Sequence, residues 1–167
     1  EQLAREVAEL QRRQKDIAQG VDERLSKFEP VKVTLDGQEF QADPGEKRDF
    51  EAALAVFRSG KFAEASTAFA SFVRQNPRSG YVPSSRFWLG NAQYAQRDYK
   101  EAIGNFKQLL TDAPTHARAP EAALSIANCQ LELKDNRASR KTLEDLVRAY
   151  PQSEAAAAAK ERLARLK

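Results

Sequence analysis

Apolar residues recur along most of the chain at the spacing of an α-helix. One segment has them at Phe62, Ala65, Phe69 and Phe72, at steps of three, four and three. This spacing places the four side chains on one face of a helix, whereas a strand would need strict alternation. The pattern therefore predicts helices, separated by short turns, over residues 46–166.

The helical pattern repeats after 37 residues. A fixed period of about 20 to 50 residues is typical of stacked helical units that share one core. Each unit closes on a proline, which lacks an N–H group and disfavours helix in the residue before it. The aligned columns are Phe50, Phe87 and Leu124; Leu89, Ile126 and Leu163; Ala53, Gly90 and Ala127; and the closing prolines Pro77, Pro114 and Pro151.

A separate final helix is predicted after the third unit. Ser153 is a suitable N-cap, and Lys160, Glu161, Arg162 and Arg165 are predicted on its outer face. An array of repeats needs such a lid, because its last unit otherwise exposes an apolar side. The predicted units are residues 46–79, 83–116 and 120–153, followed by a capping helix at 154–166, within a repeat domain of residues 46–167.

The units resemble the tetratricopeptide repeat. The third unit departs from the pattern, with Asn136 and Ser139 where an aromatic and a small residue are usual. The resemblance implies an all-α, right-handed helical solenoid of three helical hairpins plus the capping helix. The residues that carry it are Trp88, Leu89, Gly90, Tyr99, Ala102, Phe106 and Pro114 in the second unit, and Gly60, Phe62, Ala65, Phe69 and Pro77 in the first.

Residues 1–29 carry a seven-residue pattern instead. It predicts a coiled-coil oligomerisation helix, in which polar Gln14 and Arg24 would fix the register or the oligomeric state. The alternative is a single amphipathic helix packed on its own domain. The predicted contact positions are Leu3, Val7, Leu10, Gln14, Ile17, Val21 and Phe28.

Residues 30–45 break both patterns. Val31, Val33 and Leu35 alternate with polar residues ahead of an Asp-Gly pair. Asp-Gly between alternating arms is typical of a β-hairpin. Because an isolated hairpin is marginally stable, it would need support from the helices or from another chain. An extended linker is the alternative.

Composition and charge exclude several classes of protein. With 41% hydrophobic residues, the chain of 167 residues can bury a core. Its longest apolar run is the five alanines at 155–159, against the roughly 20 residues of a membrane span, so no direct membrane insertion is predicted. A net charge of +3, spread along the chain, does not predict nucleic-acid binding. The chain begins at Glu1 and contains no Met, so we expect a processed fragment that has lost any signal peptide.

Candidate catalytic groups are few. The chain has a single histidine, His116, predicted as a solvated loop residue, and a single cysteine, Cys129. Cys129 aligns with Ala55 and Ala92, which predicts a buried small residue instead of a nucleophile. Metal-ligand spacings and glycine-rich phosphate loops are absent from the sequence. We therefore predict no enzymatic activity, no catalytic residue, no metal and no cofactor.

The remaining candidate is a binding surface. The first helix of every stacked unit lines a concave groove. The amides of Asn91 and Asn128 could hold a peptide backbone, or could simply be solvated, and Phe57 and Tyr94 could instead pack between helices. A carboxylate clamp is disfavoured, because apolar side chains stand where such clamps place Lys or Arg. The predicted groove residues are Phe50, Leu54, Phe57, Phe87, Asn91, Tyr94, Leu124, Asn128 and Leu131.

The whole arrangement is similar to one family. Its marks are a polar coiled coil, a Val-Thr-x-Asp-Gly-x-x-Phe segment at 33–40, and repeats bearing Phe-Trp-Leu-Gly-Asn-Ala-Gln-Tyr and Asp-Tyr-Lys-Glu-Ala-Ile. It resembles the periplasmic Tol-Pal-associated YbgF family, also called cell division coordinator CpoB. The resemblance implies a periplasmic trimer that binds TolA, with the peptidoglycan synthase machinery as a further partner. Such a protein coordinates septal peptidoglycan synthesis with outer-membrane constriction. The alternative is a peptide-binding chaperone or assembly factor of the cell envelope.

Overall fold

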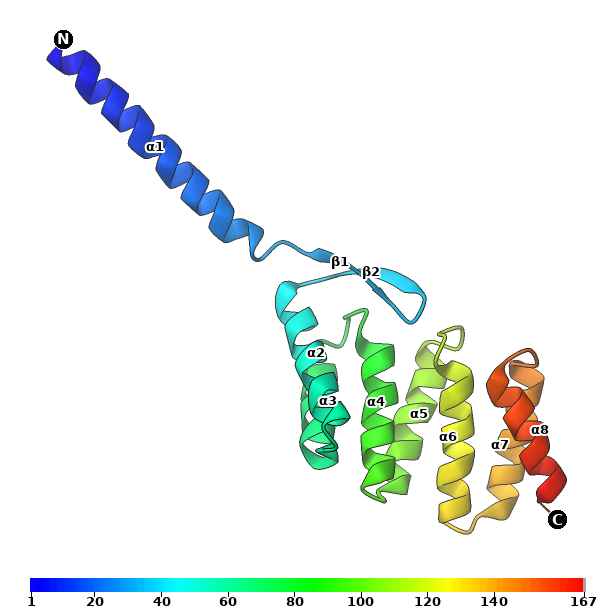
Figure 1. The fold of residues 1–167 in the computed structure, drawn as a ribbon. Helices are drawn as coiled ribbons and strands as arrows, with labels where there is room; N and C mark the ends of the chain where they lie inside the picture. The colour runs from blue at the N-terminus through cyan, green and yellow to red at the C-terminus, as the bar shows by residue number, and fades with distance from the viewer. Residues whose placement is uncertain (167) are drawn as a thin grey trace.

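The computed structural model describes residues 1–166. A long helix projects away from a stack of shorter helices, with a β-hairpin at the junction (Figure 1). The elements are α1 (Gln2–Ser26), β1 (Val31–Leu35), β2 (Gln38–Ala42), α2 (Pro44–Arg58), α3 (Phe62–Gln75), α4 (Val82–Ala95), α5 (Tyr99–Asp112), α6 (Ala119–Glu132), α7 (Asn136–Ala149) and α8 (Glu154–Arg165).

The stack consists of three helical pairs and a closing helix. α2 pairs with α3, α4 with α5, and α6 with α7, and α8 packs on the last pair. Buried apolar side chains, led by the phenylalanines of α2 to α5, form three successive clusters along the stack. The predicted all-α helical solenoid is confirmed. At its end, the Ser153 hydroxyl accepts a hydrogen bond from the Ala156 N–H at 3.0 Å, so Ser153 caps α8 as expected.

The sequence period also sets the turns. The second helices begin at Phe62, Tyr99 and Asn136, at intervals of 37 residues. Two residues before each start, the backbone has a positive φ: 81° at Gly60, 64° at Arg97 and 61° at Lys134. Glycine adopts this left-handed conformation without penalty, whereas other residues pay about 1 kcal/mol. The turn geometry is therefore kept in all three units, although only the first has glycine there.

Close approach of paired helices depends on small residues. A Cβ atom on Gly90 would lie 2.6 Å from Cζ of Phe106, which is fully buried. In the third pair, Ser139 occupies the equivalent of Ala102. Its buried hydroxyl donates to the Ala127 carbonyl at 3.0 Å, so the polar substitution leaves no unsatisfied group.

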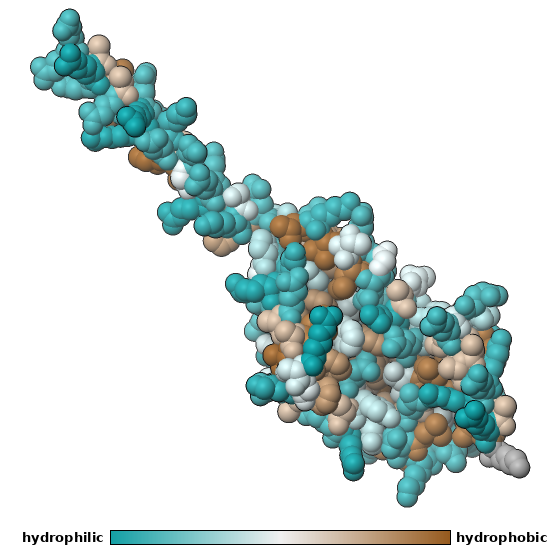
Figure 2. Space-filling view, in the orientation of Figure 1, coloured by the Kyte–Doolittle hydropathy of each residue, from teal (hydrophilic) through white to brown (hydrophobic). Residues whose placement is uncertain are grey.

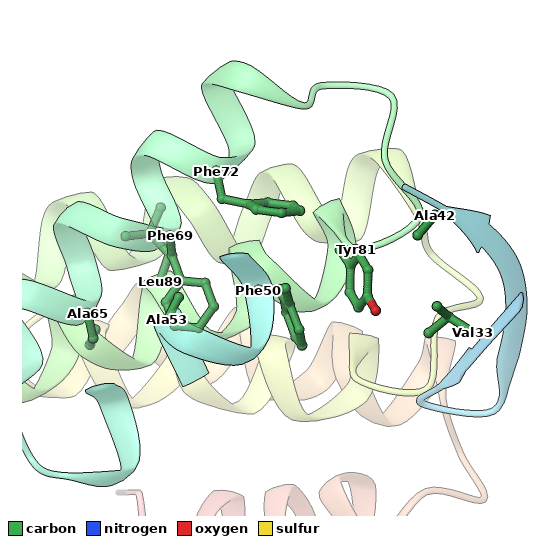
Figure 3. Packing of buried hydrophobic residues seen from close by; sticks show 10 residues of the cluster. Val33, Ala42, Phe50, Ala53, Ala65, Phe69, Phe72, Tyr81 and Leu89 are labelled. Atoms are coloured by element: carbon green, nitrogen blue, oxygen red, sulfur yellow. The ribbon is translucent and has the colours of Figure 1, made fainter. Parts of the chain in front are cut away.

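Residues 31–42 form an antiparallel hairpin in which Val33 pairs with Phe40. Its turn residues have φ of 49° at Asp36 and 75° at Gly37, the conformation that Asp-Gly favours. Val33 and Ala42 are buried against the repeats beside Tyr81 (Figure 3). The hairpin is thus supported by the helices, which offsets the marginal stability of an isolated two-stranded sheet.

Two contacts fix the hairpin at either end. Phe40 packs edge-on against Tyr81 at 4.9 Å between ring centroids and lies over Gly80, where a Cβ atom would come within 2.3 Å of its ring. At the turn, Asp36 accepts hydrogen bonds from the Ser84 hydroxyl at 2.6 Å and from Nε of Arg118 at 2.9 Å. The hairpin therefore extends across the ends of α4 and α6.

The helix α1 has no buried residue. Its apolar side chains are exposed, for example 77% at Leu3 and 67% at Ile17, among hydrophilic neighbours (Figure 2). The alternative of a helix packed on its own domain is therefore not what the structure shows. A search of residues 1–166 finds no helix with both the length and the apolar character needed to cross a membrane.

Candidate protein-binding groove

The predicted groove residues lie on the first helices of the pairs, α2, α4 and α6. They form three columns that cross the stack, one near the N-terminal ends of these helices, one in the middle and one near the C-terminal ends. The columns are Phe50, Phe87 and Leu124; Leu54, Asn91 and Asn128; and Phe57, Tyr94 and Leu131.

The first column is largely closed. Phe50 and Phe87 are each 2% exposed, and only Leu124 is partly exposed. Tyr81 stacks on Phe50 with ring centroids 4.5 Å apart, and the guanidinium of Arg118 lies 5.1 Å from the centre of the Phe87 ring. The expectation that Phe50 and Phe87 line an open groove is wrong, because their rings pack in the core against Phe69 and Phe106. Tyr81 and Arg118 from the inter-unit loops also lie against them.

The middle column keeps its polar groups near the surface. Asn91 is partly buried, and its Nδ2 donates to the Phe87 carbonyl at 2.9 Å. Oδ1 of Asn128 accepts from Arg162 of α8. Arg162 is partly buried, so its predicted place on the outer face of the capping helix is wrong. Within residues 1–166 these bonds leave the side-chain oxygen of Asn91 (Oδ1) and the side-chain amino group of Asn128 (Nδ2) available to bind a partner.

Aromatic side chains of the third column pack between neighbouring helices. Phe57 lies 5.1 Å from Trp88 and 5.3 Å from Phe62, measured between ring centroids. Tyr94 packs edge-on against Tyr99 at 5.3 Å. All of these positions in the column remain partly exposed, so the side chains can both pack and meet a partner.

The carboxylate of Glu132 joins the second and third units near the C-terminal ends of α4 and α6. The hydroxyls of Tyr94 and Tyr99 lie 3.5 Å and 3.4 Å from the two carboxylate oxygens of Glu132. Burial, together with the Glu132 charge, raises the pKa of Tyr94. Both phenols are therefore neutral donors at neutral pH.

His116 is buried, at 3% exposure, so its prediction as a solvated loop residue is wrong. Its Nδ1 accepts a hydrogen bond from the backbone N–H of Arg118 at 3.1 Å. Burial lowers the pKa of His116; the Arg118 charge acts in the same direction and the Asp36 charge opposes it. The sequence pattern did not predict this arrangement. Asp36 of the hairpin and the loop that carries His116 and Arg118 are far apart in the chain.

The free energy of unfolding is expected to fall as the pH drops from about 7.5 to about 5.5. An unfolded histidine takes up a proton near its ordinary pKa of 6.5, whereas folded His116 resists protonation. Its contribution is thus full above 6.5 and is lost as the pH falls towards the lowered folded pKa. Urea unfolding at several pH values measures this loss.

His116→Gln provides the control for this pH dependence. Since His116 is the only histidine in the chain, the variant should show a flatter dependence over the same range. Equal slopes for the two proteins would contradict the assignment to His116.

Cys129 is fully buried, as predicted for a small core residue. Burial raises the pKa of its thiol to about 11, so the thiol stays protonated at neutral pH and is a poor nucleophile or metal ligand. Within residues 1–166, no group of three or more His, Cys, Asp or Glu side chains is placed to hold a metal ion. The groove is therefore the candidate functional site.

Stacked helix pairs of this kind are typical of helical-repeat proteins, a class whose extended concave surfaces bind other proteins. Family models described as tetratricopeptide repeat match residues 50–117 and residues 93–163. The chain is a tetratricopeptide-repeat protein.

The chain is similar to cell division coordinator CpoB from Pseudomonas putida. It is 35% identical over 63 residues, which are 37% of this chain and 24% of the relative. The chain thus matches about a quarter of the length of that protein.

Solved structures share the fold. PcrH from Pseudomonas aeruginosa superimposes with a TM-score of 0.64 at 15% identity, covering 75% of this chain and 93% of PcrH. The type III secretion chaperone SycD of Yersinia enterocolitica, in complex with a peptide of the translocator YopD, gives a TM-score of 0.63 at 15% identity, covering 75% and 91%. At this identity the likeness shows the fold alone.

Proposed function

We propose that the protein is a non-enzymatic periplasmic adaptor of the Tol-Pal system, which binds TolA through its repeat domain. In this role it coordinates septal peptidoglycan synthesis with outer-membrane constriction, with the peptidoglycan synthase machinery as a further partner. The observation that carries the proposal is a tetratricopeptide groove whose amides at Asn91 and Asn128 remain near the surface. The match to cell division coordinator CpoB supports the cellular setting.

Residues 1–29 act as the oligomerisation helix in this proposal, and the family resemblance implies a trimer. The exposed stripe of α1 supports self-association, because Leu10 is 64% and Ile17 67% exposed in a single chain. A second copy would remove these side chains from water. Joining several repeat domains raises the overall affinity for a multivalent partner without any new contact.

A peptide-binding chaperone of the cell envelope is the second candidate. It is favoured by solved structures in which a similar repeat array holds a peptide, namely SycD with a YopD peptide and PcrH with the chaperone-binding region of PopD. Both candidates place the partner in the groove. They differ in whether the partner is folded TolA or an extended segment.

Calorimetric titration with the purified periplasmic part of TolA tests the proposal. We expect saturable binding with a Kd below roughly 100 µM, which corresponds to about −5.5 kcal/mol. The double substitution Asn91→Ala with Asn128→Ala should weaken binding about tenfold, because each amide supplies a hydrogen bond to the partner. Asn136→Ala, at an exposed position of α7, is the matched control and should bind normally.

The same titration examines α1 through Leu10→Lys with Ile17→Lys. Sedimentation should show a monomer, and the apparent affinity for TolA should drop as avidity is lost. The absence of saturable binding at about 100 µM wild-type protein would reject TolA as the partner and favour the chaperone.

A further inference from the structure

The helices α6 and α8 lie side by side at the end of the stack (Figure 1). A cavity of about 440 Å³ lies there, larger than the cavity of about 360 Å³ beside the hairpin. Its apolar part is formed by Ala117, Pro120, Leu124, Ala155 and Ala158. Leu124 is the one member of the first groove column that is not covered.

The 37-residue period explains why this cavity is open. Tyr81 covers Phe50, and Arg118, one period later, covers Phe87. The next residue in that series is Ala155, which stands beside Leu124. The methyl group of Ala155 is too short to extend over Leu124. In the third unit, the side chain at the first groove column therefore remains partly exposed.

The charge at the cavity indicates what fills it. Glu121 and Glu154 both line the cavity and are exposed. Glu121 already pairs with Arg118, which lies outside the lining, at 3.2 Å, so Glu154 is the carboxylate that adds uncompensated negative charge. In the preceding unit, Arg118 lies over an apolar ring and pairs with carboxylates at Asp36, 2.9 Å away, and Glu121, 3.2 Å away. An arginine of the chain itself thus already binds between an apolar ring and two carboxylates.

We propose that the cavity between α6 and α8 binds an arginine side chain of the partner protein. The aliphatic part of the arginine packs on Leu124, as long cationic side chains do on apolar surface, and its guanidinium pairs with Glu154 and with the Glu121 carboxylate, which it shares with Arg118. The partner's arginine takes the place that Arg118 holds in the preceding unit. This inference rests on the proposed protein-binding function and specifies one side chain that the groove recognises.

NMR titration of the full chain with a short probe peptide tests the proposal. The probe is acetyl-Gly-Leu-Arg-Leu-Gly-amide, and its matched control has glutamine in place of arginine. The arginine peptide should shift the backbone amide signals of Leu124, Ala155 and Ala158 with a saturable curve. The glutamine peptide should bind at least tenfold more weakly, and added salt should weaken the arginine peptide because charges are screened.

Two variants make the test specific to the cavity. Ala155→Arg restores the missing cover from within the chain and should abolish the shifts. Glu154→Gln should weaken the arginine peptide about two- to fivefold, as expected for loss of an exposed ion pair, whereas Glu161→Gln, on the same helix but outside the cavity lining, should leave it unchanged. Thermal unfolding checks that each variant is folded.

Equal binding of the two peptides, or unchanged shifts in Ala155→Arg, would overturn the proposal. The titration contains no TolA. A failure here therefore leaves the adaptor proposal standing, and a failure of TolA binding leaves the peptide result unaffected.

Discussion

Gly90→Ala is expected to lower the free energy of unfolding by about 2 kcal/mol or more. The added Cβ atom would lie 2.6 Å from Cζ of Phe106, whose ring is fully buried between α4 and α5. Overpacking of a dense core typically costs about 1–3 kcal/mol, because rings must leave their preferred rotamers or the helices must separate. Urea unfolding measures the loss.

Gly104→Ala is the matched control for this prediction. It makes the same change in the helix that carries Phe106, at an exposed position where a Cβ atom meets nothing within 4 Å. Alanine is the better helix former, so this variant should gain about 0.5–1 kcal/mol. If both variants changed the free energy of unfolding in the same direction, the close approach of α4 and α5 would not be what restricts position 90 to glycine.

Asp36→Ala is expected to cost about 2–3 kcal/mol and to release the hairpin from the repeats. It removes the acceptor of the Ser84 hydroxyl and of Nε of Arg118, where the Asp36 side chain is only 9% exposed. Breaking a fully buried ion pair costs about 3–5 kcal/mol, and the value is smaller here because the Arg118 side chain is 33% exposed. Hydrogen exchange of the amides in residues 31–42 should accelerate.

Asp36→Asn separates the contribution of the Ser84 hydrogen bond from that of the ion pair with Arg118. Asparagine tolerates the positive φ of 49° at this turn and can still accept from Ser84, but it carries no charge for Arg118. It should cost about 1 kcal/mol and leave the hairpin docked. Slow exchange of the hairpin amides in Asp36→Ala would show that Val33 and Phe40 suffice to hold it.

The helical stack could be predicted because its information is local and repeated. Apolar spacing within each helix and the closing prolines depend on residues a few positions apart. The period then places equivalent residues together without knowledge of the fold, so the sequence alone could assign Gly90 and Phe106 to matching positions of a helical unit. Even the diverged Ser139 keeps its place, since its hydroxyl finds a backbone acceptor.

The closed half of the groove could not be predicted in the same way. Phe50 and Phe87 have groove positions in the sequence pattern, but their rings pack in the core and are also contacted by Tyr81 and Arg118 from the inter-unit loops. The loop that carries His116 is likewise met by Asp36 of the hairpin through Arg118, a contact that no local pattern indicates. A signal was present in the 37-residue series Tyr81, Arg118 and Ala155, whose variation in size predicts which units are covered.

The bond between Asp36 and Arg118 also affects the order of folding. The two residues are 82 positions apart, whereas the helix pairs of the stack join segments that follow one another directly. Neighbouring repeats can fold as the chain lengthens, because each contacts only the next. The hairpin lacks its last attachment point until the start of α6 has been synthesised. In a chain that emerges from its N-terminal end, the segment that joins α1 to the repeats therefore appears early and is secured late.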